Sequence, residues 1–160
     1  MDSGAFSPQD GQMFLQVVAL ATATWLAPIP GALVDQDFNP PTKAWGAGHR
    51  GVDFEAEPGT EVLAIGPGTV RFVGDIGGKP VVVIEHPSLG LRSTYEPVVA
   101  IVEVGQVVTT GDPIGETAQE GGHCAGHCLH LGLKGPGKHD YRNPMRFIND
   151  GFAVLKAPNS

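Results

Sequence analysis

From residue 51 onward, short apolar runs alternate with clusters of glycine and proline, and this spacing restricts the fold more than any other feature. The chain of 160 residues contains 23 glycines and 14 prolines, which interrupt it too often for long helices. Short strands separated by turn residues at such regular intervals are typical of a β-sandwich or an open barrel. The expected strands are 61–64, 69–73, 81–86, 92–95, 100–104, 113–116 and 128–133. The sequence therefore predicts an all-β fold.

The composition is that of a globular domain with an acidic balance. Hydrophobic residues make up 41% of the chain and charged residues 17%, and the formal net charge is −7 with histidine neutral. A chain of this length suits one domain. Its negative charge disfavours a basic surface for nucleic acid or anionic lipid. We expect a monomer with no nucleic-acid partner.

The first 27 residues have the character of an export leader. The apolar run 13–27 is too short and too interrupted by polar residues to span a bilayer. A secretory segment with a cleavage point near Ala21 or Ala23 fits it better, although no basic residue precedes the run and a buried N-terminal helix is the alternative. We expect a secreted or cell-envelope protein with an extended Pro- and Gly-rich arm over 28–48, a domain over 49–150 and a tail over 151–160.

Two stretches carry residues that suit a metal ion. His49 and Asp53 are four apart, so in an extended chain their side chains point the same way. Imidazole nitrogen and carboxylate oxygen are both good ligands of Zn²⁺. In the second stretch, leucines at 129, 131 and 133 alternate with Cys128, His130 and Gly132, which places His130 on the face opposite the core. Three protein ligands with an open fourth position are typical of a catalytic zinc site.

These stretches resemble the lysostaphin/LytM-type zinc endopeptidases over roughly residues 45–148. The resemblance is carried by His49-Arg50-Gly51-Val52-Asp53-Phe54, Gly59-Thr60-Glu61-Val62, Gly68-Thr69-Val70, Thr94-Tyr95, Val104-Gly105-Gln106-Val107-Val108, Gly111-Asp112-Pro113-Ile114-Gly115, Leu129-His130 and Asn143-Pro144. The family implies an antiparallel β-sheet core with a groove, Zn²⁺ held by His49, Asp53 and His130, and hydrolysis of peptide cross-links in bacterial peptidoglycan. Peptide stems of peptidoglycan are then the expected partner.

Two positions depart from the family pattern. Pro97 and Cys128 stand where the family commonly has histidines that assist catalysis, which is similar to a subgroup with Tyr-Glu-Pro and Cys-Leu-His at these places. His123 and His127 are candidate replacements, with exposed loop histidines as the alternative. Tyr95 is a candidate for lining the groove with its hydroxyl near the metal, or else for packing in the core. Strand alternation predicts that Glu96, although a tempting general base, points away from the groove.

The two cysteines, Cys124 and Cys128, allow two interpretations. A disulfide suits an exported chain, because thiols are oxidised outside the cytoplasm. Alternatively, Cys128 lies on the same strand face as His130 and offers a thiolate ligand for zinc. We favour the disulfide.

Three functions are compatible with these features. The leading hypothesis is a zinc endopeptidase that acts on cell-wall peptides. The second is a domain that retains zinc but only binds the cell wall or regulates another hydrolase, because the assisting histidines are missing. The third is a biotinyl or lipoyl carrier, but Lys79 lacks the expected flanking residues and the histidines at 49 and 130 would have no role.

Overall fold

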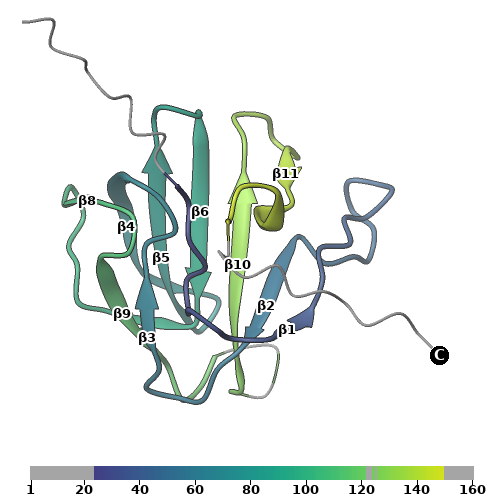
Figure 1. The fold of residues 1–160 in the computed structure, drawn as a ribbon. Coiled ribbons are helices and arrows are strands. Elements are labelled where there is room, and N and C mark those ends of the chain that lie inside the picture. Colours follow the sequence, from purple (N-terminus) through teal and green to yellow (C-terminus); the bar gives the residue numbers. More distant parts are fainter. Residues whose placement is uncertain (1–23, 122–123, 125, 150–160) are drawn as a thin grey trace, which may run out of the picture.

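A computed structural model of the chain describes residues 24–121, 124 and 126–149. Its strands are β1 (Val34–Gln36), β2 (Gly51–Glu55), β3 (Glu61–Leu63), β4 (Gly68–Ile76), β5 (Lys79–His86), β6 (Leu91–Glu96), β7 (Val98–Ala100), β8 (Val107–Val108), β9 (Pro113–Thr117), β10 (Cys128–Lys134) and β11 (Tyr141–Arg142), followed by a short 3₁₀ helix η1 (Pro144–Arg146). Within the described residues there is no α-helix, so the expected all-β fold is confirmed (Figure 1). The same residues include no helix that is long and apolar enough to cross a membrane.

The strands form two antiparallel sheets. The main sheet has the order β1-β2-β10-β6-β5-β4-β8, with β11 pairing along part of β10. The second sheet has the order β3-β9-β7 and contacts the main sheet near β5. β10 lies between β2 and β6, which come from distant parts of the sequence. Antiparallel pairing therefore brings the two sequence stretches that carry the candidate ligands onto neighbouring strands.

One face of the main sheet is apolar and packs in the core. Leu129 pairs with Phe54, and Leu131 pairs with both Val52 and Tyr95. Residues directly opposite one another on antiparallel strands project to the same face, and all five side chains are almost completely buried. The apolar side chains of the second sheet join the same cluster. The opposite face of β2, β10 and β6 is therefore the one that carries Asp53 and His130.

Several strand expectations require correction. The expected strand 100–104 is wrong, because β7 covers Val98–Ala100 and a turn follows it. β2 is also missing from the expected strands, although an extended chain is predicted around His49 and Asp53, and β1, β8 and β11 have no counterpart among them. β1 and β8 have burial patterns without a regular apolar alternation, and β8 and β11 are each two residues long, so none carries a recognisable period. Such short elements are defined by their pairing partners and not by their own sequence.

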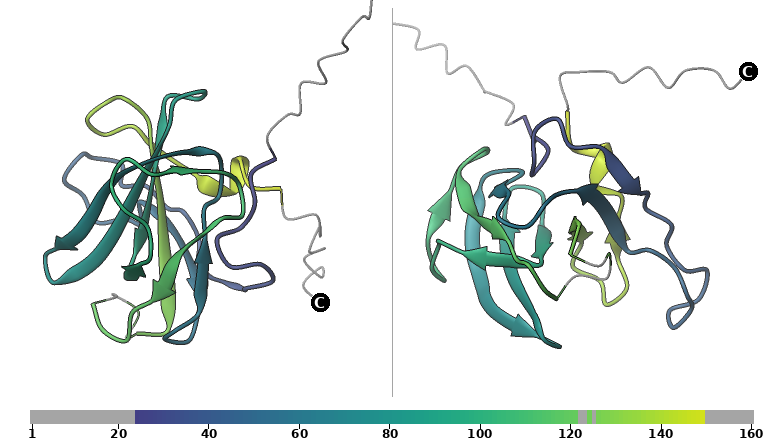
Figure 2. Two further views of the ribbon diagram at one scale, coloured as in Figure 1. Left: turned by 90° about the vertical axis from the view of Figure 1, so that its left-hand side faces the viewer. Right: turned by 90° about the horizontal axis from the view of Figure 1, so that it is seen from below.

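The N-terminal part of the described chain belongs to the folded domain. Trp25 is 5% exposed, forms an isolated bridge with Ile148 and accepts a backbone hydrogen bond from Asn149 at 2.8 Å. Ile29 is also in the core, and the two ends of the described chain lie near one another (Figure 2). Trp25, which falls within the segment 1–27 expected as a leader, therefore packs with the folded domain. Residues 1–23 of the expected leader and the tail 151–160 lie outside the described residues.

Candidate metal centre

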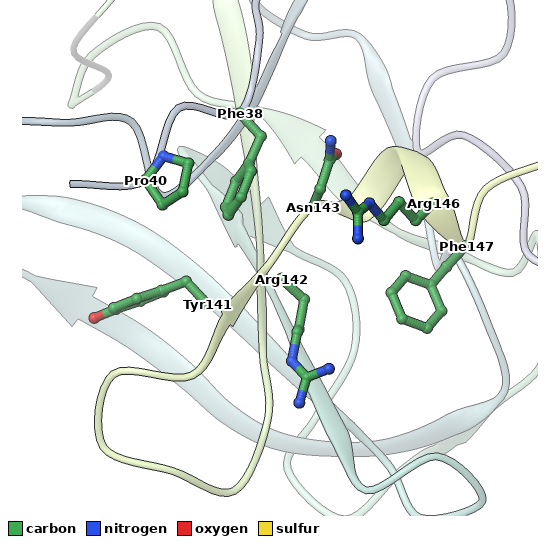
Figure 3. A pocket seen from close by; sticks show the side chains of 7 residues that line it. All are labelled: Phe38, Pro40, Tyr141, Arg142, Asn143, Arg146 and Phe147. Atoms are coloured by element: carbon green, nitrogen blue, oxygen red, sulfur yellow. The ribbon is translucent and has the colours of Figure 1, made fainter. Parts of the chain in front are cut away.

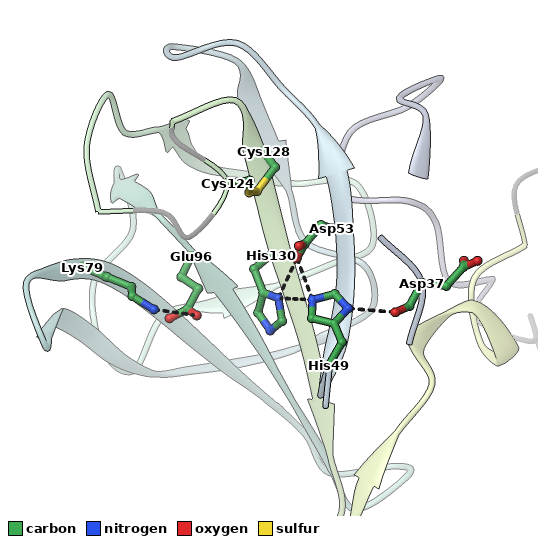
Figure 4. A network of polar contacts seen from close by, with 8 residues as sticks. All are labelled: Asp37, His49, Asp53, Lys79, Glu96, Cys124, Cys128 and His130. Carbon is green, nitrogen blue, oxygen red and sulfur yellow. Dashed lines mark hydrogen bonds and ion pairs between the residues drawn. A yellow bond between two sulfur atoms is a disulfide. The ribbon is translucent and has the colours of Figure 1, made fainter. Parts of the chain in front are cut away.

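The three side chains expected as metal ligands lie together on the side of the main sheet opposite its apolar face (Figure 4). His130 and Asp53 are paired across β10 and β2, and His130 Nδ1 lies 2.7 Å from Asp53 Oδ1. His49 precedes β2, and its Nε2 lies 3.0 Å from the same oxygen and 3.2 Å from His130 Nδ1. The three donor atoms thus form a small triangle around one point of the surface.

The segment before β2 fixes the orientation of His49. Its backbone exchanges two hydrogen bonds with Asn39, at 2.7 and 2.9 Å, and its Nδ1 lies 2.8 Å from the carbonyl oxygen of Asp37. A carbonyl can only accept, so Nδ1 carries the proton and Nε2 points a lone pair at the triangle. Such a contact to the second ring nitrogen is the usual way in which proteins orient a metal-binding histidine. The Pro- and Gly-rich arm over 28–48 therefore fixes the position of His49.

The donor set fits a zinc ion. Ligands at about 2.0–2.1 Å around tetrahedral Zn²⁺ lie about 3.3–3.4 Å apart, and the three donor atoms here are 2.7, 3.0 and 3.2 Å apart, so small outward movements would admit the ion. Asp53 is 1% exposed, and its carboxylate faces the lone pair of His49 Nε2. Two acceptors face one another at this distance only if a cation, either a proton or a metal ion, lies between them. The residues present therefore suit a divalent metal with two nitrogen ligands and one oxygen ligand.

A glycine allows the His130 ring to take its place. A Cβ atom at Gly51 would lie 2.6 Å from His130 Nε2 and would also collide with the carbonyl oxygen of Leu131. The imidazole therefore lies against the bare backbone of β2. The His-Arg-Gly-Val-Asp motif thus combines two ligands with the small residue that makes room for the third.

The cysteines lie next to the same carboxylate. Cys124 and Cys128 form a disulfide, and their sulfurs belong to a second group of potential ligands whose donor atoms, including Asp53, lie within 4.8 Å of one another. Cys128 pairs with Glu55 and shares the strand face of His130, as the alternation of β10 requires. The disulfide between Cys124 and Cys128 is the interpretation favoured from the sequence. The alternative, a Cys128 thiolate as zinc ligand, requires the sulfur to lie near Asp53, which it does.

Two other candidate residues, Tyr95 and His127, are not among the three clustered side chains. Tyr95 is fully buried on the opposite face, where its hydroxyl accepts a hydrogen bond from Ile65 N at 3.0 Å and lies 3.1 Å from Ser93 Oγ. Burial raises the pKa of Tyr95 to about 12, so the phenol stays protonated. Its interpretation as a groove residue is therefore wrong, and the alternative, core packing, applies. His127 lies at the surface, 3.4 Å from Glu57 Oε2. His123 lies outside the described residues.

The structure corrects the expectation for Glu96. This residue pairs with His130 across β6 and β10, so both project from the same face of the sheet. Sequence alternation had assigned Tyr95 to the groove and Glu96 away from it. The alternation itself holds, but the pairing of Tyr95 with Leu131 reverses which of the two faces the cluster. Nothing in the sequence reveals the register of β6 against β10.

A pocket of about 440 Å³ is lined by none of the three candidate ligands (Figure 3). It is lined by Phe38, Pro40, Tyr141, Arg142, Asn143, Arg146 and Phe147. Arg142 is bound to Asp140, which holds the pKa of that carboxyl below its usual range. No residue that the sequence analysis singled out for chemistry lines this pocket.

Comparison with known families matches residues 47–144 to the model of peptidase family M23. The chain belongs to this family. It is 44% identical over 139 residues to proteins called uncharacterised in Mycobacterium tuberculosis (Rv2891) and Mycobacterium bovis (Mb2915). The match covers 85% of this chain but only 55% of each relative, so the chain spans about half the length of these curated relatives.

Solved structures of similar fold agree with the family. The antimicrobial peptidase lysostaphin from Staphylococcus simulans has a TM-score of 0.70 at 22% identity, and the alignment covers 88% of this chain and 60% of that one. A zinc-containing peptidase from Vibrio cholerae has a TM-score of 0.56 at 27% identity, covering 69% and 36%. The lysostaphin/LytM-type resemblance is thus confirmed for the family and for the fold.

Proposed function

We propose that the chain is a zinc metalloendopeptidase domain that hydrolyses peptide cross-links of bacterial peptidoglycan, and that it acts outside the cytoplasm. The observation that carries this proposal is the triangle of His49 Nε2, Asp53 Oδ1 and His130 Nδ1 on the exposed side of a family M23 fold. The membership of peptidase family M23 supports peptide hydrolysis, and the resemblance of the sequence motifs to lysostaphin/LytM-type endopeptidases implies a cell-wall substrate. The N-terminal apolar run supports export.

The residues at this site would have distinct roles in metal binding and in ligand orientation. His49, Asp53 and His130 would hold the ion, and Asp37 would keep the His49 ring in the tautomer that binds metal. Bound zinc supplies Lewis-acid chemistry, which polarises a carbonyl and makes water more acidic. The side chain of His130 is 15% exposed and that of Asp53 is 1% exposed, so a substrate would approach the ion from the side of His130, with Asp53 buried beneath it.

The test is digestion of purified peptidoglycan with and without added zinc, scored by newly released amino groups. We expect release only with the metal, and we expect His130→Ala to abolish both zinc binding and release. One zinc per chain is expected for wild type. Equal zinc contents in wild type and His130→Ala would remove the ligand assignment.

The second candidate is a zinc-retaining domain that binds the cell wall or regulates a hydrolase. Pro97 and the buried, disulfide-paired Cys128 favour it, because neither can act as the assisting histidine of the family. Full zinc occupancy without release of amino groups from peptidoglycan of several sources would establish this candidate in place of the enzyme.

A further inference from the structure

The strand face that carries the metal cluster also carries an ionisable pair beside it. Glu96 ends β6 directly opposite His130, and Cβ atoms of such opposite residues are about 4.5–5.5 Å apart. Asp53 occupies the equivalent place on β2, across the other edge of β10. His130 therefore has a carboxylate on each side, and Figure 4 shows Glu96 on the side away from His49.

Glu96 differs from Asp53 in its surroundings. Asp53 is buried and belongs to the ligand triangle, whereas 21% of the Glu96 side chain is exposed and its carboxylate is in neither group of potential ligands. Lys79, at the start of β5, places its Nζ 3.7 Å from Glu96 Oε1, and 35% of its own side chain is exposed. One negative and one positive group thus stand beside the cluster, within reach of solvent and of a substrate on this face.

Glu96 and Lys79 could supply the two catalytic functions for which Pro97 and Cys128 leave no histidine. Peptide hydrolysis needs a group that takes a proton from the attacking water and a positive group near the oxygen that gains negative charge. Pro97 has no ionisable side chain, and Cys128 is 2% exposed and held in a disulfide. The side chain of His127 is engaged with Glu57 at the surface. Glu96, the strand partner of His130, and Lys79, which is paired with Glu96, offer a negative and a positive group on this side of the cluster.

We propose that Glu96 is the proton acceptor of the proposed hydrolysis and that Lys79 stabilises the developing negative charge. Water attacks the peptide carbonyl carbon while one of its protons moves to a Glu96 carboxylate oxygen. The C–N bond then breaks, and the proton passes from Glu96 to the leaving nitrogen. One water and one peptide bond give one carboxyl group and one amine, and Glu96 returns to its carboxylate form. This inference rests on the proposed function and identifies residues that replace the missing histidines.

The decisive variant is Glu96→Gln, which keeps the size of the side chain and removes its basic oxygen. We expect kcat on a soluble cross-link peptide to fall about 10²–10⁴-fold, the usual contribution of a general base. Zinc content and the affinity for the uncleaved peptide, measured by calorimetry, should stay at the wild-type values. Lys79→Met should lower kcat by up to about 10²-fold, and Lys79→Arg should restore most of it, because the positive charge is retained.

Two control variants match Glu96 closely. Glu85→Gln removes a strand carboxylate that is also partly buried and paired with a basic residue, Arg71. Glu85 lies near the end of β5, whereas Lys79 lies at its start. Glu55→Gln removes an exposed carboxylate on the same sheet face, opposite Cys128. Both should keep the wild-type kcat.

The outcomes separate this inference from the proposed function. An inactive wild type with full zinc would overturn the proposed function and this role with it. An active wild type whose Glu96→Gln variant is equally fast would overturn only the role of Glu96. Loss of zinc or of peptide affinity in Glu96→Gln would make Glu96 a structural residue and would also overturn the inference, as would a loss of kcat in Glu55→Gln instead.

Discussion

The His49 ring is held from both sides, and this arrangement explains why its position is defined before any metal binds. On one side its Nδ1 donates to the carbonyl of Asp37, and on the other its Nε2 faces Asp53. The ring is 8% exposed, so little freedom remains to be lost when a metal binds. Preorganised ligands of this kind favour tight metal binding because the ordering cost has been met during folding.

Replacement of Gly51 should disturb the cluster through both the His130 ring and the backbone of β10. In Gly51→Ala the new methyl group would lie 2.6 Å from His130 Nε2, and the carbonyl of Leu131 on the backbone cannot yield easily. We expect zinc affinity to fall about 10–100-fold, as is typical when the support of a ligand is disturbed. Competition with a chromogenic chelator measures this change.

Gly132→Ala is the matched control. Gly132 is the strand partner of Gly51, and a Cβ atom there would meet His130 Nε2 and Thr94 only at ordinary contact distance, 3.8 Å. We expect wild-type zinc affinity in this variant. Similar affinities in both variants would mean that the His130 ring does not depend on the space at Gly51.

At the scale of single residues, the sequence was informative where a local rule decides the outcome. Alternation along β10 correctly separated His130 from the leucine row, and the four-residue spacing correctly placed His49 and Asp53 together. It failed for Glu96 and Tyr95, because their faces depend on the register between β6 and β10. That register is set by the packing of the whole sheet and has no signal within the segment.

At the scale of elements, β10 organises the site because it pairs with β2 and β6 and leads out of the cysteine-containing loop. Cys128 is its first residue, and the disulfide to Cys124 ties this loop to the strand two residues before His130. Closing a loop of this size stabilises a fold by about 2 kcal/mol in the chain-entropy model. The disulfide thus supports the strand on which the third ligand lies.

We therefore expect the purified chain to contain a disulfide and no thiols. Its mass should be about two units lower than that of the reduced form, because two protons leave when the bridge closes. The double variant Cys124→Ser/Cys128→Ser should lose about 2 kcal/mol of unfolding free energy and should keep its zinc. If the freshly purified protein reacts with an alkylating reagent at Cys128, and if Cys128→Ser loses zinc, then the thiolate interpretation is correct.

A second link between elements is a buried polar chain beneath the sheet. His86 on β5 has its Nδ1 2.8 Å from the carbonyl of Pro67 and its Nε2 2.7 Å from Ser93 Oγ on β6, which in turn contacts the Tyr95 hydroxyl. Burial lowers the pKa of His86, because charging the ring inside the core is costly. The histidine is therefore neutral in the folded chain.

This shift predicts an acid-sensitive contribution to stability. Below the ordinary histidine pKa of 6.5, the unfolded chain binds a proton at this position that the folded chain does not. The unfolding free energy contributed by His86 is thus complete above that pH and is lost as the pH falls toward the folded pKa. Urea titrations between pH 7.5 and 5 should show a smaller loss of stability in His86→Gln than in wild type. Parallel pH profiles for the two proteins would contradict the assignment.

At the scale of the whole molecule, the two ends of the described chain close the core together. Trp25 packs against His86 and Phe147, with ring centroids 4.5 and 5.6 Å away, and against Gly66, where a Cβ atom would touch the indole. Leu26 N donates to Ile65 O at 2.9 Å. The sequence could not separate these residues from a leader, because an apolar run has the same composition in a signal segment and in a core. Only the contacts made by Trp25 distinguish the two.

The packing of Trp25 limits where an export leader can end. Truncating a buried tryptophan to alanine removes its contacts and leaves a cavity, so we expect Trp25→Ala to lower the unfolding free energy by about 3–5 kcal/mol. Trp45→Ala is the control, because Trp45 is 84% exposed and its loss should change stability by less than about 0.5 kcal/mol. Urea unfolding followed by circular dichroism compares them without relying on tryptophan fluorescence. Because Trp25 belongs to the core, N-terminal sequencing of secreted protein should show a chain that begins before this residue. A mature chain that starts after Ala27 and is as stable as the longer form would show that Trp25 is dispensable and that the core is complete without it.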